Sequence, residues 1–262
     1  MRILRFTPPT GSNLGSDPLF GILEDNSTIR LVNGDPLYSG IQLREERIPL
    51  ESVRILAPVI PRSKVVCVGK NYADHAAEMG GEVPKEPIIF LKPNTSVIGP
   101  NDIINWPIQS ERVDHEAELA IVISRICKDV PKERYKDVIF GYTIANDVTA
   151  RDIQKGDGQW TRGKSFDTFC PLGPWIDTEF LPAKQRITAE VDGEIKQNAH
   201  LDEMVFDIPT IINFISSAMT LLPGDVILTG TPAGIGPVIP GKEVKIAIEG
   251  LGELTNRVSA RG

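Results

Sequence analysis

Residues 113–122 constrain this chain most, because they place two glutamates two positions apart at the head of an apolar, β-branched run. In a strand, Glu116 and Glu118 leave the same face with backbones about 6.6 Å apart, whereas in a helix they diverge by about 200°. Two like charges on one face repel unless a cation lies between them, and Mg²⁺, Mn²⁺ and Ca²⁺ prefer carboxylate oxygens. The spacing therefore permits a metal site, although a solvated strand face is the ordinary interpretation. His115 points to the other face, where packing or support of the site is expected.

Length and charge restrict the class of protein. The 262 residues can form one large core, or a core with a small satellite domain. A net charge of −7 and a pI near 5.1 argue against nucleic acid and anionic membranes as partners, but permit a small anion if a cation lies in its site. No apolar run approaches the roughly 18 residues of a membrane span, and the start lacks a secretory signal, so we expect a cytoplasmic protein.

Turn residues and cysteines narrow the fold. The 23 glycines and 21 prolines imply many turns, which favours a strand-and-loop protein over a helical bundle. Cys67, Cys127 and Cys170 are far apart and form no C-x-x-C pair, so we expect reduced, structural cysteines.

The chain divides near Pro58 and Pro61. Before these prolines, short strand patterns alternate with turns, which predicts a small β-rich domain over 1–57. The predicted strands are 2–6, 19–23, 28–32 and 53–55. The remaining residues, 58–262, contain the motifs that carry chemistry, and the last strand we predict is 226–228.

A short helix is predicted after the buried strand 65–68. Asn71 is a suitable N-cap and Gly80-Gly81 is a stop signal, which leaves about two turns. His75 and Glu78 then lie at i and i+3 on one face, within hydrogen-bond reach. A surface pair is the ordinary alternative. A helix this short, between glycines, is also a candidate for a mobile segment.

Later segments add further polar groups. Asp147 ends a buried strand at 141–148, where sites are often assembled, although a cap or turn residue is the ordinary alternative. Helices are predicted at 131–139 and 207–221, and Asp192-Gly193 indicates a hairpin. The basic and aromatic residues 160–167 are predicted to lie outside the deep core. The loop 229–237 lacks a P-loop or dinucleotide pattern, so it is either a carboxylate site using Thr231 or a plain turn.

Five segments, in this order, resemble the fumarylacetoacetate hydrolase family. They are residues 69–78, 114–118, 146–152, 164–167 and 228–232. The resemblance covers about residues 60–250 and implies an α+β, β-rich fold, a mixed, multilayered β-sandwich roll with a small N-terminal β-rich domain. It also implies the shorter bacterial and archaeal type, which is usually a homodimer.

The resemblance assigns roles to nine residues. The metal carboxylates fall on Glu116, Glu118 and Asp147, the catalytic dyad on His75 and Glu78, the site lysine on Lys164, and substrate contacts on Gln154, Thr231 and Lys70. Related sequences often carry arginine where this chain has Lys70, so this position leaves substrate identity more open than the metal site.

Such a site suits a small anionic 2-oxo acid. Three carboxylates on Mg²⁺, with Mn²⁺ or Ca²⁺ as alternatives, leave positions open for a carboxylate and an adjacent oxygen. The ion would stabilise an enolate at the 2-oxygen, with Lys164 adding positive charge. His75, oriented by Glu78, would move protons or activate water.

The expected activity is C–C hydrolysis of acylpyruvates or decarboxylation of oxaloacetate. One alternative is an isomerase or decarboxylase of the 2-hydroxyhepta-2,4-diene-1,7-dioate type, since the resemblance covers all three reactions. A non-catalytic metal- or carboxylate-binding protein is the alternative from a different class, and the intact His75, Glu78 and Lys164 argue against it. A purely structural β protein would need three carboxylates to converge by chance.

Overall fold

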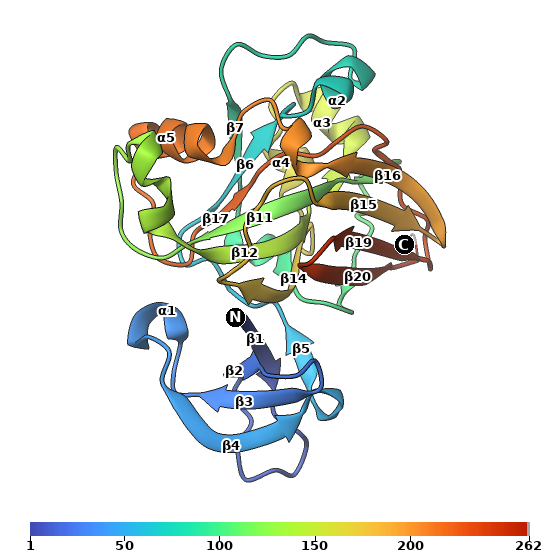
Figure 1. Cartoon of the computed structure of the whole chain (residues 1–262). Helices are drawn as coiled ribbons and strands as arrows, with labels where there is room; N and C mark the ends of the chain where they lie inside the picture. The colour runs from blue at the N-terminus through green and yellow to red at the C-terminus, as the bar shows by residue number, and fades with distance from the viewer. Residues whose placement is uncertain (261–262) are drawn as a thin grey trace.

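The computed structural model describes residues 1–260, and its main feature is a twelve-stranded sheet (Figure 1). Its strand order is β4-β3-β2-β1-β14-β12-β11-β17-β6-β7, with β5 paired to β1 and β8 to β14. The strands are β1 (Arg2–Thr7), β2 (Leu19–Leu23), β3 (Thr28–Val32), β4 (Leu43–Pro49), β5 (Arg54–Leu56), β6 (Val65–Gly69), β7 (Ile88–Lys92), β8 (Val97–Ile98), β11 (Ala117–Ile123), β12 (Ile139–Asn146), β14 (Cys170–Asp177) and β17 (Val226–Leu228). The sheet is mostly antiparallel, with parallel pairs between β17 and β6 and between β14 and β8.

Two smaller sheets complete the strand framework. One has the order β13 (Thr149–Ala150), β10 (Val113–His115), β18 (Gly236–Pro237), and the other β16 (Glu194–His200), β15 (Arg186–Val191), β19 (Glu243–Ile248), β20 (Gly252–Val258), β9 (Ile103–Ile104). Asp192 and Gly193, both with positive φ, form the tight turn between β15 and β16 that their sequence predicts. The fold is strand-rich α+β with several sheets, as predicted.

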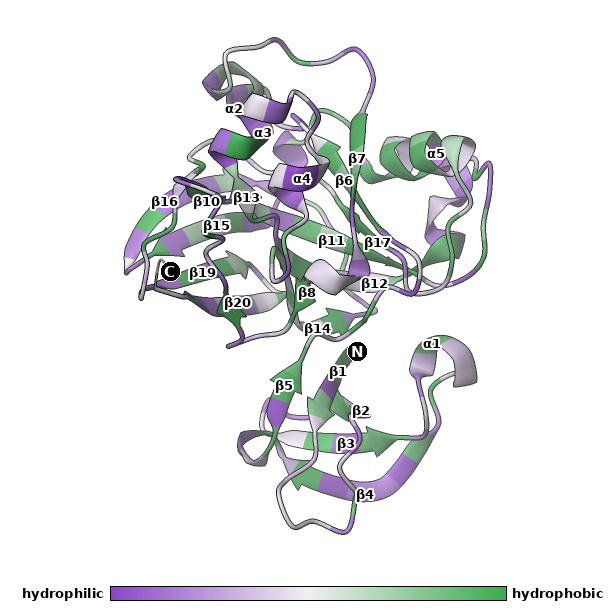
Figure 2. Cartoon of the chain, turned by 180° about the vertical axis from the view of Figure 1, so that it is seen from behind, coloured by the Kyte–Doolittle hydropathy of each residue, from purple (hydrophilic) through white to green (hydrophobic). Residues whose placement is uncertain are grey.

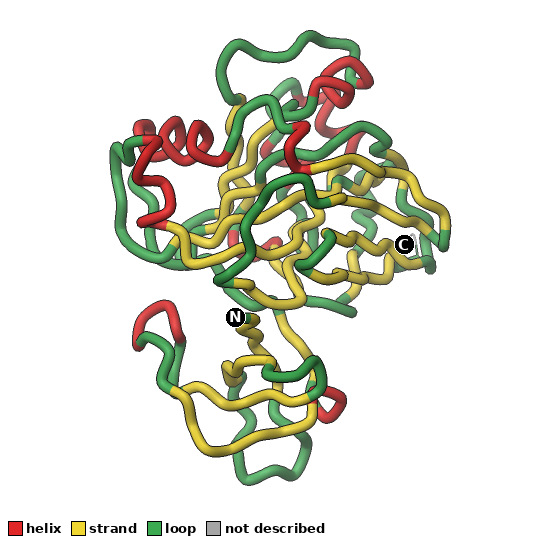
Figure 3. The backbone as a smooth tube through the Cα atoms, viewed as in Figure 1, coloured by secondary structure: helices red, strands yellow, loops and turns green. Residues whose placement is uncertain are grey.

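Helices are short and lie at the outside of this strand framework (Figure 3). They are α1 (Pro36–Ser39), α2 (Ala73–Glu78), α3 (Arg151–Asp157), α4 (Thr161–Lys164), α5 (Ile208–Ala218) and the 3₁₀ segments η1 (Leu50–Ser52), η2 (Asn94–Ser96), η3 (Lys132–Val138) and η4 (Leu201–Glu203). α5 begins where the Asp207 side chain accepts from Thr210 N, and it buries Ile211, Ile212 and Ile215. No helix within residues 1–260 is both long enough and apolar enough to cross a membrane.

The N-terminal strands extend the large sheet. β1 pairs with β14 through Arg2 opposite Asp177 and Ile3 opposite Ile176. It also pairs with β2 along most of its length and with β5 near its end. A separate apolar cluster, including Leu4 and Phe6, fills this part, which lies below the main body in Figure 1. One sheet therefore links the two parts of the chain.

β11 lies at the centre of the core, with every residue buried. Leu119 and Ile121 pack into the cluster that includes residues of β15, β19 and α5, whereas Ala120 and Val122 pack into a second cluster with residues of β6 and β17. Figure 2 shows β6, β11 and β17 as strongly hydrophobic. Glu118 is a buried residue of this strand, which has an apolar cluster on each of its two faces.

Three of the strand predictions need correction. The predicted strand 113–122 is interrupted at Glu116, where the chain passes from the β10 sheet to the twelve-stranded sheet. The prediction missed β4 because LREERIP is charged and largely exposed, as is common for edge strands. It also ended the strands too early, since β19 and β20 follow β17.

Two helix predictions also need correction. α2 begins after Tyr72 without a side-chain cap. Asn71 instead donates to the carbonyls of Thr229 and Phe206, because its buried amide joins two loops. The predicted helix at 131–139 is the 3₁₀ segment η3, preceded by Pro131.

Candidate active site

Three buried carboxylates from two neighbouring strands converge. Glu116 precedes β11, Glu118 lies on β11, and Asp147 follows β12, with oxygen atoms of all three within 4.8 Å of one another. Two hydrogen bonds hold these segments together: Asp147 N donates to Glu116 O at 2.9 Å, and Glu116 N donates to the side-chain oxygen of Asn146 at 3.0 Å. The i, i+2 spacing and the position at a strand end thus place these groups together.

Two buried lysines contact this carboxylate cluster. Lys164 Nζ, on α4, lies 2.7 Å from both Glu116 Oε2 and Asp147 Oδ2, and Lys92 Nζ, at the end of β7, lies 2.5 Å from Asp147 Oδ1. Burial acts to lower the pKa of Lys164, but Asp147 and Glu116 outweigh it and raise that pKa. The prediction that 160–167 avoid the core was wrong for Lys164, which is 2% exposed, because the carboxylates stabilise its charge inside the protein.

Arg151, the first residue of α3, links the cluster to a fourth acid. Its guanidinium donates to Asp114 Oδ2 at 2.8 Å, to Glu116 Oε1, and to Gln154 Oε1 at 2.6 Å. Arg112, whose side chain is more exposed than that of Arg151, donates from Nε to Asp114 Oδ1 at 2.8 Å. Arg151 therefore neutralises part of the acidic charge and orients Gln154.

The carboxylates differ in their surroundings. Burial acts to raise the pKa of Glu116, but Lys164 and Arg151 lower it well below its usual range. Glu118 has no cation in contact among residues 1–260, and its hydrogen bond comes from Gly230 N at 2.6 Å. Burial raises the pKa of Glu118 well above its usual value, and Asp147 and Glu116 raise it further. Glu118 is thus the acid that lacks a positive partner.

This donor set fits a divalent cation. Glu116, Glu118 and Asp147 supply hard oxygen ligands at mutual distances suited to a single ion, in a site from which solvent is largely excluded. A cation would also supply the positive partner that Glu118 lacks. Carboxylate ligands without histidine or cysteine favour Mg²⁺ or Mn²⁺ over zinc.

The predicted dyad lies at the wall of the same site. His75 Nδ1 is 3.3 Å from Glu78 Oε2, and Gly234 N donates to both Glu78 oxygens, at 3.1 and 3.3 Å. A neutral His75 that donates from Nδ1 keeps the Nε2 lone pair for another proton. Gly234 belongs to the glycine-rich loop that follows β17, so this loop orients Glu78, which orients His75.

One narrow cavity connects these groups. Its lining includes Lys70, His75, Phe90, Glu116, Glu118, Asp147, Arg151, Gln154, Trp160, Lys164 and Thr231. Its free volume is about 30 Å³, which is room for an ion or a water. α2 contributes His75 to this lining, and Met79, directly after α2, lines it as well.

Lys70 has an unusual backbone at this wall. Its φ is +55°, a left-handed conformation that side-chain-bearing residues seldom adopt. Its ammonium forms no ion pair or hydrogen bond with residues 1–260. An uncompensated cation at the mouth of a cavity is suited to an anionic ligand.

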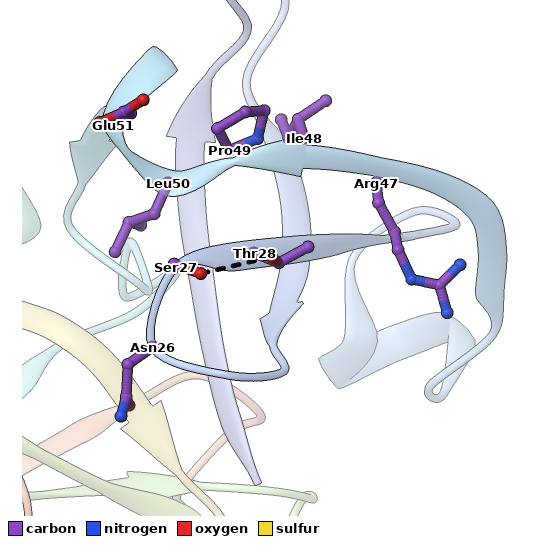
Figure 4. A pocket seen from close by; sticks show the side chains of 8 residues that line it. All are labelled: Asn26, Ser27, Thr28, Arg47, Ile48, Pro49, Leu50 and Glu51. Atoms are coloured by element: carbon purple, nitrogen blue, oxygen red, sulfur yellow. Dashed lines mark hydrogen bonds between the residues drawn. The ribbon is translucent and has the colours of Figure 1, made fainter.

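A larger pocket of about 680 Å³ lies elsewhere, where β3 begins and β4 ends in the N-terminal part (Figure 4). Asn26, Ser27 and Arg47 contribute to its wall, and Arg47 is already paired with Glu24 at 2.8 Å. Within residues 1–260, the group of acids that could hold a metal ion lies at the smaller site instead.

Eight of the nine site residues predicted from the sequence line this cavity. The ninth, Glu78, contacts His75. The individual roles of these nine residues stay predictions. Sequence reasoning overlooked four buried polar residues that organise the site, Lys92, Asp114, Arg151 and Gln197. Lys92 shares a strand face with Phe90, and both side chains are buried, but the run 88–91 is apolar on both faces and so did not indicate which face is inward. Gln197 carried no signal, since its strand is otherwise largely exposed.

The sequence of this chain matches two family models and several curated proteins. The family described as fumarylacetoacetate (FAA) hydrolase C-terminal matches residues 64–259, and one described as Rv2993c-like, N-terminal matches residues 1–58. Protein Rv2993c of Mycobacterium tuberculosis is 52% identical, covering 100% of this chain and 99% of its own length. Rat mitochondrial oxaloacetate tautomerase Fahd2a is 46% identical, covering 80% and 71%.

Solved structures agree in fold. A 5-carboxymethyl-2-hydroxymuconate delta-isomerase from Mycobacterium smegmatis superposes with a TM-score of 0.90 at 46% identity, covering 99% of this chain and 100% of that one. A maleylpyruvate hydrolase from a Sphingobium species, in complex with manganese(II) and pyruvate, gives a TM-score of 0.80 at 31% identity, covering 100% of both chains.

Proposed function

Because the chain belongs to the fumarylacetoacetate hydrolase family, we propose that it is a divalent-metal-dependent enzyme that acts on a small 2-oxo acid through an enolate. The observation that carries this proposal is the convergence of Glu116, Glu118 and Asp147 at a cavity that also holds Lys164 and His75. The manganese and pyruvate bound to the maleylpyruvate hydrolase relative support the same class of cofactor and substrate.

Each group of residues has a distinct task. Glu116, Glu118 and Asp147 would hold the ion, which when bound supplies a Lewis acid for the 2-oxygen. Lys164 and Arg151 add positive charge where the substrate carboxylate and the developing enolate need it. These charges are fixed before the substrate arrives, so little reorganisation is needed during reaction.

His75 is the group suited to move a proton. Glu78 holds its Nδ1 at 3.3 Å, and the imidazole lines the cavity with 6% exposure. The Nε2 lone pair could take a proton from C3 of the substrate or return one to it, and could equally activate water. The same base therefore serves isomerisation and hydrolysis.

C–C hydrolysis of acylpyruvates and decarboxylation of oxaloacetate both pass through this enolate, and we propose them as the primary activities. Enol-to-keto isomerisation is the second candidate, favoured by the isomerase and tautomerase names of relatives 46% identical to this chain. The unpaired ammonium of Lys70 at the cavity wall would favour substrates with a second carboxylate.

A substrate panel with product identification tests the proposal. Oxaloacetate, acetylpyruvate and a 2-hydroxydienedioate would be incubated with the protein and Mg²⁺ or Mn²⁺, before and after chelation, and the products identified by NMR. We expect metal-dependent turnover of at least one of them above the rate with metal alone. Turnover of none, together with unchanged metal affinity in Glu116→Ala, would contradict the proposal.

A further inference from the structure

We propose that Gln197 is a positioning residue that fixes the hydroxyl of Thr231 as a hydrogen-bond donor toward the cavity, where it binds a carboxylate oxygen of the substrate. This inference rests on the proposed function, because it concerns how the same site recognises its 2-oxo acid. Gln197 lies on β16, outside every segment that suggested the site from sequence.

Gln197 is unusually placed for a glutamine. It is 0% exposed, whereas Lys196 and Asn198 on either side of it are exposed. A buried amide is costly unless its donors and acceptors are satisfied. Gln197 satisfies them with four hydrogen bonds, which reach His115, Ala117, Thr231 and Pro232.

Two backbone groups determine which end of this amide is oxygen. Ala117 N, which can only donate, lies 2.9 Å from Oε1, and the carbonyl of Pro232, which can only accept, lies 2.8 Å from Nε2. A flipped amide would place its NH₂ against the Ala117 N–H and its oxygen against the Pro232 carbonyl. The orientation of Gln197 therefore follows from groups whose roles have no alternative.

The direction of the Thr231 hydroxyl follows from this orientation. Gln197 Nε2 donates to Thr231 Oγ1 at 2.8 Å, so the hydroxyl oxygen acts as an acceptor. The Thr231 side chain makes no other hydrogen bond within residues 1–260, although the residue is 1% exposed and lines the cavity. Its hydroxyl hydrogen is thus available for a ligand acceptor, such as a carboxylate oxygen.

The same amide ties this donor to the metal carboxylates. Oε1 holds the backbone of Ala117, the residue between Glu116 and Glu118, while Nε2 holds Thr231 and Pro232. His115 Nδ1 lies 3.1 Å from the same Oε1. His115 therefore helps to hold the Gln197 amide and is not placed as a metal ligand. Gln197 therefore sets the distance between the candidate ion site and the carboxylate donor.

A double-mutant cycle tests the inference. Thr231→Val removes the hydroxyl at similar volume, Thr231→Ser keeps it, and Gln197→Met removes the amide. We expect Thr231→Val and Gln197→Met each to raise the KM for the 2-oxo acid by roughly tenfold to a hundredfold, the loss of one hydrogen bond to a charged group. kcat should change less than about threefold, Thr231→Ser should stay near wild type, and the double variant should be no worse than the poorer single one.

Several outcomes would overturn the inference. They are an unchanged KM in Thr231→Val, additive effects in the double variant, or a Gln197→Met variant that loses Mg²⁺ affinity while its KM stays normal. Gln42→Met, an exposed glutamine of the N-terminal part, is the matched control and should leave KM unchanged. If Gln197→Met fails to fold by circular dichroism, Gln197→Glu, which also lacks the amide donor to Thr231, replaces it in the cycle.

A binding readout separates this inference from the proposed function. Oxalate presents a carboxylate beside a second pair of oxygens, so its affinity for the Mg²⁺-loaded protein can be measured by calorimetry without turnover. Weaker oxalate binding in Thr231→Val and Gln197→Met, with no substrate turned over by wild type, would uphold the donor and reject the activity. Equal oxalate binding in all variants would reject the donor even if the enzyme is active.

Discussion

Glu118 accepts a hydrogen bond from the backbone N of Gly230 at 2.6 Å, while no cation within residues 1–260 contacts its carboxylate. The two other carboxylates of the cluster each contact a lysine. Burial, followed by the charges of Asp147 and Glu116, raises the pKa of Glu118 well above its usual value. The protein has therefore placed an acid where only an additional positive charge makes its ionised form favourable.

Metal binding should release a proton from Glu118. At a pH between the usual glutamate pKa, about 4.3, and its raised value in the fold, Glu118 holds a proton that an ion must displace. Mg²⁺ affinity should rise with pH across that interval. Calorimetric titration in two buffers of different ionisation enthalpy measures the proton count, and a count of zero throughout would contradict the assignment.

Glu118→Gln should make the metal-free protein more stable at pH 8. A carboxyl with a raised folded pKa contributes stability below its unfolded pKa, and this contribution is lost as pH rises through the folded pKa. A folded pKa one pH unit above the unfolded pKa corresponds to about 1.4 kcal/mol of free energy. Urea unfolding from pH 5 to 8 should therefore show a falling free energy of unfolding in wild type and a flatter profile in the variant.

The same variant should gain no stability from Mg²⁺, in contrast to wild type. Glu133→Gln, on an exposed part of η3, is the matched control and should behave as wild type in both experiments. A Glu118→Gln protein that is less stable without metal, or equally stabilised by Mg²⁺, would show that Glu118 serves a structural purpose instead.

Replacement of Lys70 should separate stability from substrate recognition. Lys70→Gly removes the side chain from a left-handed position at φ +55°, so we expect a gain of about 1 kcal/mol in the free energy of unfolding. The KM for a dicarboxylic 2-oxo acid should rise roughly tenfold in Lys70→Gly and Lys70→Met, since a charge-assisted contact is lost.

The KM for a monocarboxylic substrate should change little in either Lys70 variant. Lys85→Met, in the exposed loop after α2, is the control for loss of one positive charge. Equal effects on mono- and dicarboxylic substrates would remove Lys70 from recognition of a second carboxylate.

His75→Ala should reduce turnover without affecting the candidate metal site. His75 lies beside Glu78 rather than in contact with the three carboxylates, and general acid–base groups contribute about 10²- to 10⁴-fold. We expect kcat to fall by that factor and the Mg²⁺ dissociation constant to change less than about twofold. Retained hydrolysis in His75→Ala would exclude the dyad from the delivery of water.

Local spacing indicated only part of the site, and the family resemblance supplied the remaining residues, such as Lys164 and Thr231. Glu116 and Glu118 share a side because strands alternate, although the strand is interrupted at Glu116. Asp147 was identifiable at the end of an apolar run. Lys92 was missed because a lysine beside a proline is typical of a turn, yet it is 1% exposed while its neighbour Leu91 is 42% exposed.

The remaining structure depends on distant contacts that no local pattern shows. Gln197 is buried because the start of β11 and the glycine-rich loop supply its partners, across 80 and 35 residues of chain respectively. The edge strand β4 was missed because its charges suit exposure, and β19 and β20 were missed when the last strand was placed at 226–228. These are tertiary effects that override local propensity.

Enolate formation at this cavity can be measured by deuterium exchange at C3 of pyruvate in D₂O, followed as loss of the methyl signal in proton NMR. An enolate is common to hydrolysis, decarboxylation and isomerisation, and pyruvate reports its formation without a further reaction. We expect exchange with wild type and Mg²⁺ that chelation, Glu118→Gln and His75→Ala each abolish. Exchange no faster than with Mg²⁺ alone would contradict the claim that this cavity generates an enolate.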